Sequence, residues 1–168
     1  MNSKNLLLTG VPGCGKSTLI ENIVKKIPGP VRGFITREIR SKGERVGFRI
    51  LTLDGKEGVL AHKDSPSLLR VGRYGVNVDQ LEKIALPAME PANPEEVVVI
   101  DEIGKMECLS LRFRETLRRL LDSENRVIGS IALKGDPFIQ RIKQRPDVLL
   151  VQVTEKNRNS LADALMPD

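Results

Sequence analysis

Residues 6–18 read LLLTGVPGCGKST, and this stretch decides the fold of the chain. The apolar run 6–9 predicts a strand, and the apolar residues of 17–26 recur at helical spacing. Between them, Gly10 to Ser17 matches the pattern GxxxxGK[ST]. A glycine loop between a strand and a helix directs successive backbone N–H groups and a helix N-terminus at one point, so the stretch predicts a phosphate-binding loop.

The loop pattern assigns roles to its side chains. Lys16 is expected to reach the β and γ phosphates, the hydroxyl of Ser17 to bind Mg²⁺, and Thr18 to donate near the α-phosphate. The expected ligands are therefore ATP, GTP and other nucleoside triphosphates, with Mg²⁺ as cofactor. The remaining residues of the expected cradle are Gly10, Val11, Pro12, Gly13, Cys14 and Gly15.

A second motif lies at residues 97–102. Val97 to Ile100 is a continuous β-branched run, which is typical of a parallel strand covered on both faces. Asp101 and Glu102 follow it, and ligands of open α/β sheets collect at the carboxyl ends of the strands. We expect Asp101 to hold the magnesium shell and Glu102 to act as general base on a water molecule, which favours hydrolysis over transfer to another acceptor.

The rest of the chain alternates apolar runs with helix-period segments. This alternation predicts an α/β fold, a mainly parallel sheet flanked by helices with right-handed crossovers. β-prone runs separated by turn residues predict one antiparallel hairpin insertion at about 31–62. We expect one domain over residues 1–168. Helices are expected at 17–26, 77–88, 109–122, from Asp136-Pro137 onward and at 159–165, and further strands at 127–132 and 148–153.

Composition narrows the class of protein. The chain has 168 residues and a net charge of +5, so it is one domain of ordinary size that suits anionic partners. With four Phe, one Tyr and no Trp, the stacking platforms of many single-strand binders are scarce. Cys14 and Cys108 cannot form a disulfide framework or a four-ligand metal site. Without a signal-like or membrane-spanning stretch, we expect a cytoplasmic protein that does not engage membranes, and a monomer.

Five blocks in this order carry a family resemblance: Gly10–Thr18, Gly33–Glu38, Gly72–Val76, Val99–Glu107 and Val153–Arg158. Together they resemble the thermophile-type nucleoside-triphosphatase family, which includes a human cancer-related nucleoside-triphosphatase. The resemblance implies a P-loop NTPase domain with a RecA-like core and a Mg²⁺-dependent phosphohydrolase of broad base tolerance and slow turnover. It also implies that the strand 127–132 lies between the P-loop strand and the Asp-Glu strand.

Further site residues follow from that architecture. Ser130 and Lys134 are candidates for sensing the γ-phosphate at the end of the intervening strand. The transferring phosphoryl group needs an additional cation. The candidates for that cation are Arg37, Arg40, Arg73 and Lys105. In the loop after the last strand, Asn157 is expected to hydrogen-bond the base edge and Arg158 to stack on the base.

Two other functions stay open at the level of sequence. A small-molecule or nucleoside kinase would use the same phosphate cradle but would need a pocket for its acceptor. A nucleotide-dependent switch that binds nucleic acid or protein would use the basic hairpins at 25–49, where eight basic residues face two acidic ones.

Overall fold

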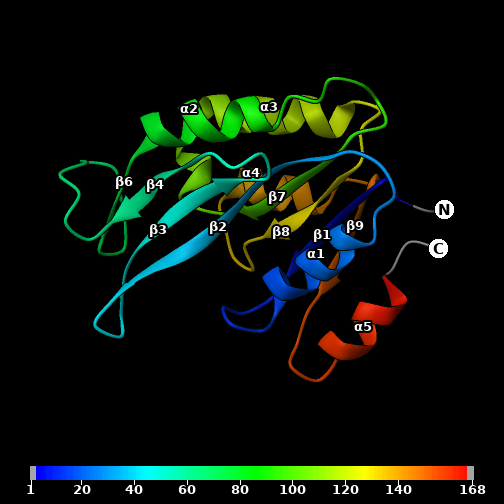
Figure 1. Ribbon diagram of the computed structural model, residues 1–168, viewed down its shortest axis with the longest axis horizontal. Coiled ribbons are helices and arrows are strands. Elements are labelled where there is room, and N and C mark those ends of the chain that lie inside the picture. The colour runs from blue at the N-terminus through cyan, green and yellow to red at the C-terminus, as the bar shows by residue number, and fades with distance from the viewer. Residues whose placement is uncertain (1–2, 166–168) are drawn as a thin grey trace.

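The computed structural model describes residues 3–165, and one mixed sheet organises them. Nine strands of this region are ordered β5-β6-β4-β3-β2-β7-β8-β1-β9. Figure 1 shows the sheet running across the molecule, with helices on both faces. The α/β class expected from the sequence is confirmed.

The parallel part of the sheet holds the two sequence motifs. It consists of β2 (Val31–Ser41), β7 (Val97–Ile103), β8 (Val127–Ile131), β1 (Asn5–Thr9) and β9 (Val148–Gln152). β8 lies between β1 and β7, as the resemblance implies. Every residue of β1 and β8 is buried, because helices cover both faces of these central strands.

The antiparallel part continues the same sheet beyond β2. It consists of β3 (Glu44–Thr52), β4 (Glu57–His62), β6 (Tyr74–Val76) and β5 (Arg70–Val71). The segment 31–62 therefore differs from the expected insertion in two respects. β2 pairs in parallel with β7 and so belongs to the core, and the antiparallel part extends to Val76. The short strands β5 and β6 are too brief to show period-2 alternation, which explains why the sequence did not reveal them.

Two helices cover one face of the sheet and three cover the other (Figure 1). α1 (Lys16–Lys25) and α5 (Arg158–Ala164) pack with a smaller apolar cluster around Leu8 and Val99. The larger cluster, around Phe34 and Phe113, is completed by α2 (Val78–Ala88), α3 (Leu111–Asp122) and α4 (Pro137–Lys143). A short 3₁₀ helix, η1 (Glu107–Leu109), joins β7 to α3.

Capping side chains set where two of these helices begin. The hydroxyl of Ser110 accepts a hydrogen bond from the Phe113 amide, and the carboxylate of Asp136 accepts one from the Ile139 amide. These bonds satisfy N–H groups that the first turn of a helix leaves free, and Pro137 follows Asp136 as a first-turn proline. Within residues 3–165, no helix has the length and apolarity needed to cross a membrane.

Candidate active site

A cavity of about 600 Å³ runs along the carboxyl ends of the strands. Its lining residues come from the loop before α1, from β2, β3, β4, β5 and β7, and from the segments after β7, β8 and β9. Ligand sites in open α/β sheets collect at this edge. The cavity therefore lies where the sequence motifs are expected to converge.

The phosphate loop has the backbone shape that its glycines allow. Gly13 has a φ of 80° and Gly15, the N-cap of α1, a φ of 107°. A side chain would be strained at both angles, so the curl of the loop depends on glycine. Lys16 Nζ donates to the Gly10 carbonyl oxygen at 2.7 Å, which holds the ammonium group across the mouth of the loop.

Only some of the residues expected to form the phosphate cradle line the cavity. Pro12, Gly13, Gly15, Lys16, Ser17 and Thr18 line the cavity. Gly10, Val11 and Cys14 are not part of that lining. The Cys14 side chain is buried in the α1-side core, only 2% exposed, and the Cys14 amide donates to the Val11 carbonyl oxygen within the loop.

Asp101 lies beneath the cavity floor with one carboxylate oxygen unsatisfied. Its Oδ1 accepts a hydrogen bond from Ser130 Oγ at 2.6 Å, whereas Oδ2 is buried without a hydrogen-bond partner among the described residues. An orphaned buried carboxylate oxygen fits a hydrated divalent cation. Residues 3–165 contain no group of three or more His, Cys, Asp or Glu side chains that could together hold a metal ion. That sparse set suits Mg²⁺, which keeps several waters and takes the remaining ligands from phosphates.

Ser130 therefore has a different place from the one expected. It is fully buried and its hydroxyl is engaged by Asp101, so it orients that carboxylate rather than facing a phosphate. Lys134, the other sensor candidate, is exposed and lines the cavity.

An irregularity in β7 separates the directions of the two carboxylates. Ile100 pairs with Gly129 and Ile103 pairs with Ile131, so β7 has one more residue than β8 over this stretch. Such a bulge re-aims side chains. Asp101 consequently packs below the cavity, whereas its neighbour Glu102 lines it.

Glu102 lines the cavity together with Lys16. Burial raises the pKa of the Glu102 carboxyl, the Lys16 ammonium lowers it and the neighbouring Asp101 raises it. A carboxyl with a raised pKa is a stronger base once ionised than one at the ordinary value.

Glu107 is a second buried carboxyl on the cavity wall, and the sequence motifs assign it no role although it ends the block Val99–Glu107. Glu107 Oε2 accepts a hydrogen bond from the Gly104 amide at 3.1 Å. Burial and the nearby Glu102 raise its pKa to about 8. A Cβ on Gly104 would stand 2.8 Å from Glu102 Oε1 and 3.0 Å from Glu107 Oε2, so both carboxyls approach the same glycine.

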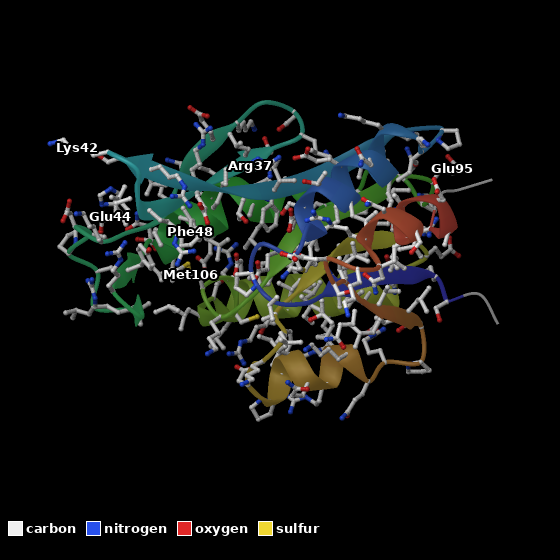
Figure 2. The ribbon with its side chains drawn as sticks, turned by 90° about the horizontal axis from the view of Figure 1, so that it is seen from below. Arg37, Lys42, Glu44, Phe48, Glu95 and Met106 are labelled. Carbon is white, nitrogen blue, oxygen red and sulfur yellow. The ribbon has the colours of Figure 1, made fainter. Side chains whose placement is uncertain are left out.

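Two of the four candidate cations line the cavity, namely Arg37 and Lys105. Arg37 forms an ion pair with Glu21 of α1, and Figure 2 shows it on β2. Arg40 and Arg73 instead pair with Glu38 and Glu44 on the antiparallel part of the sheet, and neither lines this cavity.

The loop after β9 contributes one of its two expected residues. Arg158 lines the cavity, and its Cδ lies against Gly15. Asn157 uses both ends of its amide inside its own loop, because Oδ1 accepts from the Thr154 amide at 2.7 Å and Nδ2 donates to the Gln152 carbonyl at 2.9 Å. The side-chain amide of Asn157 therefore shapes the loop, and of the two residues only Arg158 lines the cavity.

The strand order, with β8 between the cradle strand and the carboxylate strand, is that of a RecA-like P-loop nucleotide-binding protein. Comparison with known proteins identifies the family within that class. A family model described as NTPase matches residues 5–166, and the chain belongs to this family.

Relatives at high identity agree with this membership. The chain is 46% identical to the nucleoside-triphosphatase THEP1 of Thermotoga maritima, covering 96% of this chain and 92% of the relative. It is 39% identical to the human cancer-related nucleoside-triphosphatase, covering 95% of this chain and 93% of the relative.

Two solved structures have the same fold. The crystal structure of THEP1 from Aquifex aeolicus superimposes with a TM-score of 0.88 at 35% identity, covering 96% of both chains. The solution structure of the human cancer-related nucleoside triphosphatase gives 0.81 at 36% identity, covering 96% of this chain and 94% of that one.

Proposed function

We propose that this chain hydrolyses nucleoside triphosphates to diphosphates and phosphate in a Mg²⁺-dependent reaction. Relatives of nearly full length carry the name nucleoside-triphosphatase. The observation that carries the proposal is that Lys16, Ser17 and Glu102 line one cavity, and that Asp101, which precedes Glu102 on β7, keeps a buried carboxylate oxygen without a hydrogen-bond partner among the described residues. These residues supply the groups needed for phosphate binding, metal retention and proton transfer.

Binding of the triphosphate is assigned to the loop and to Lys16. The N-terminus of α1 and the loop amides attract the phosphate oxygens, and Lys16 exchanges its bond to the Gly10 carbonyl for a phosphate oxygen. Ser17 and Asp101 would hold Mg²⁺. The ion supplies charge neutralisation on the phosphate oxygens when bound.

Glu102 is assigned to the attacking water. Its carboxylate accepts the proton of a water molecule whose oxygen attacks the γ-phosphorus in line, while the bond to the bridging β–γ oxygen breaks. Nearby Lys16 favours the ionised form of Glu102, which is the form that accepts the proton.

Broad base tolerance and slow turnover are proposed on two further observations. Phe48 of β3 is the aromatic residue among the cavity-lining residues within 3–165. Arg158 lines the cavity on the side of the phosphate loop. An arginine plane stacks on any base and discriminates weakly. Arg37 is held by Glu21 rather than directed freely at the phosphates, so it must leave that pair before it stabilises a transition state.

The basic hairpins give less support to the nucleic-acid switch than the sequence suggested. Five arginines of this region form ion pairs with glutamates, so much of the positive field is neutralised locally. The pairs are Arg32–Glu96, Arg37–Glu21, Arg40–Glu38, Arg45–Glu38 and Arg49–Glu57.

Replacing Lys16 tests the cradle. We expect Lys16→Ala to weaken ATP binding at least tenfold in titration calorimetry, because the variant loses a charge-assisted bond to the phosphates. Lys26→Ala, a change on the exposed end of the same segment, should bind ATP like the parent chain. Unchanged ATP affinity in Lys16→Ala would contradict the cradle.

Replacing Glu102 tests the proton acceptor. Glu102→Gln keeps the size and the hydrogen bonding of the side chain but cannot take a proton. We expect Mg·ATP binding to persist while phosphate release slows by on the order of 10² to 10⁴, the range for a lost general base. Turnover at the parent rate would remove this role from Glu102.

A further inference from the structure

The cavity is longer than a nucleotide bound on the P-loop requires. Its lining extends in sheet order from the P-loop past β7 and β2 to β3, β4 and β5. β1 and β3 are four strand spacings apart, which is about 19 Å at the usual distance between neighbouring strands. The triphosphate is held at the β1 end, so a separate part of the cavity lies beyond the γ-phosphate.

We call this part the distal chamber and define it by its lining residues Thr36, Glu38, Phe48, Leu60, Val71 and Met106. Figure 2 shows Phe48 and Met106 near one another on the antiparallel side of the molecule. Phe48, Val71 and Met106 are half-buried and rest on the larger apolar core, whereas Leu60 is 1% exposed. The chamber therefore offers an apolar wall that is built on the core of the protein.

The chamber also has polar groups. Thr36 supplies a hydroxyl, and Glu38 supplies a carboxylate at the rim. Arg45 of β3 also lines this part of the cavity, where its guanidinium pairs with Glu38 at 3.4 Å and lies 5.2 Å from the centre of the Phe48 ring. Although burial raises it, hydrogen bonds from Arg40 and Arg45 bring the pKa of Glu38 below its ordinary value, so this group is an anion at neutral pH. A few placed polar groups on an apolar wall are typical of a small-molecule site.

Water needs no such chamber. A hydrolase requires only a place for one solvent molecule beside Glu102, and an apolar wall stabilises nothing in that reaction. Glu102 is on β7, which lies between β2 and β8 in the sheet. Its carboxyl is therefore at the point where the phosphate part of the cavity meets the distal chamber. A nucleophile bound in the chamber would reach the γ-phosphate at the position assigned to water.

Resting on the proposed nucleotide site, we propose that the distal chamber binds a small, ring-bearing primary alcohol as an alternative phosphoryl acceptor. The alcohol oxygen forms a bond to the γ-phosphorus, and the bond to the bridging β–γ oxygen breaks. The electron pair of that bond leaves with the nucleoside diphosphate, and Glu102 takes the hydroxyl proton. The ring packs on Phe48 and Met106, whose aromatic and thioether groups favour such contacts.

The test follows the fate of the γ-phosphate by ³¹P NMR. The full chain is incubated with Mg·ATP and either benzyl alcohol or 4-aminobenzyl alcohol, and the ratio of phosphomonoester to inorganic phosphate is measured. Two variants accompany the parent chain. Val71→Phe fills the chamber, and Val59→Phe adds the same ring on β4 outside this cavity.

We expect the parent chain to form ester with both alcohols, and more with 4-aminobenzyl alcohol, whose amino group can donate to Glu38. Val71→Phe should lower the ester-to-phosphate ratio at least tenfold, whereas Val59→Phe should keep the parent ratio. Using a ratio removes any effect that a variant has on the nucleotide site itself.

Each other result overturns a stated part of the proposal. Phosphate release without ester from either alcohol overturns the acceptor chamber and leaves the proposed hydrolase intact. If Val71→Phe keeps the ester-to-phosphate ratio of the parent chain, the proposed position of the acceptor in the distal chamber is wrong. Absence of both phosphate and ester overturns the proposed function, and the chamber proposal falls with it.

Discussion

At the scale of single residues, Glu107 is a carboxyl kept in the protein interior without a compensating cation. The groups that act on it in the described chain are the carboxylates Glu102 and Asp101 and the amides of Gly104 and Glu107. Burial favours the neutral acid, and so does the neighbouring carboxylate. The folded protein therefore carries a proton on Glu107 at neutral pH.

This proton makes stability depend on pH in a definite direction. The unfolded chain releases the proton near the ordinary value of 4.5, whereas the folded chain keeps it up to about 8. Between these values the folded state binds more protons, so the free energy of unfolding falls as pH rises. We expect Glu107→Gln to be more stable than the parent at pH 8, by on the order of 2 to 4 kcal/mol, and to be close to the parent below pH 5.

Urea denaturation at pH 5 and pH 8 measures this difference. Glu102 has a raised pKa as well, so the variant reduces the pH dependence without abolishing it. Glu115→Gln, at an exposed position of α3, should keep the pH dependence of the parent. An identical loss of stability in the parent and Glu107→Gln would show that Glu107 is ionised in the folded protein.

Residue roles were predictable to different extents. Lys16 and Ser17 belong to a spacing pattern in one loop, so their place needed no tertiary information. Ser130 and Asn157 were assigned to ligands from their positions alone, yet each is engaged by a protein group. Which partner a polar side chain chooses depends on neighbours that are distant in the sequence.

At the scale of elements, the turn between β7 and η1 brings the two cavity carboxyls together. Gly104 lies between Glu102 and Glu107, and its amide binds the latter. The absence of a side chain at Gly104 leaves room for both carboxyl groups. The turn therefore sets how closely the two cavity carboxyls approach each other, as well as connecting β7 to η1.

A methyl group at this turn should change rate more than stability. The atoms that a Cβ on Gly104 would meet are the ends of flexible side chains, which can move aside. We expect Gly104→Ala to displace Glu102 and to lower kcat about tenfold or more, since misplaced catalytic groups lose rate steeply.

The measurements are kcat, Mg·ADP affinity and Tm on the same preparation. Mg·ADP affinity and Tm should stay near the parent values, because the cradle and the core are untouched. If Gly104→Ala lowered Tm but kept the kcat of the parent chain, Gly104 would matter for the stability of the fold and not for the reaction.

Most elements were predictable because their signals are local. The helix at 137–143 followed from Asp136-Pro137, and the strands of the parallel core followed from apolar runs. The bulge at Ile100 to Ile103 was not predictable, because it depends on the pairing of β7 with β8. Strands β5 and β6 were missed since two and three residues show no periodicity.

At the scale of the whole molecule, ligand binding should stabilise the folded chain. Mg·ATP bound as proposed would contact the loop before α1 and, through the ion, Asp101 of β7, and would so link elements of the parallel core. At a concentration about 100 times its Kd, such a ligand adds about 2.7 kcal/mol to the free energy of unfolding. For a chain of this size we expect a rise in Tm of about 5 to 10 °C.

Scanning calorimetry with ATP, with and without EDTA, checks this link. The part of the rise that requires Mg²⁺ should disappear with EDTA and should be smaller in Ser17→Ala. An equal rise with EDTA in the parent chain would show that the ion takes no part in binding.

The sequence by itself determined the phosphate loop, the acidic strand end and the alternation that makes an α/β sheet, since each is written within a short window. The tertiary structure alone decided that the cavity continues over β2 to β5, that Glu107 joins Glu102, and that Ser130 holds Asp101. These features arise where strands far apart in the chain become neighbours, and the contacts formed there depend on packing and burial rather than on local spacing.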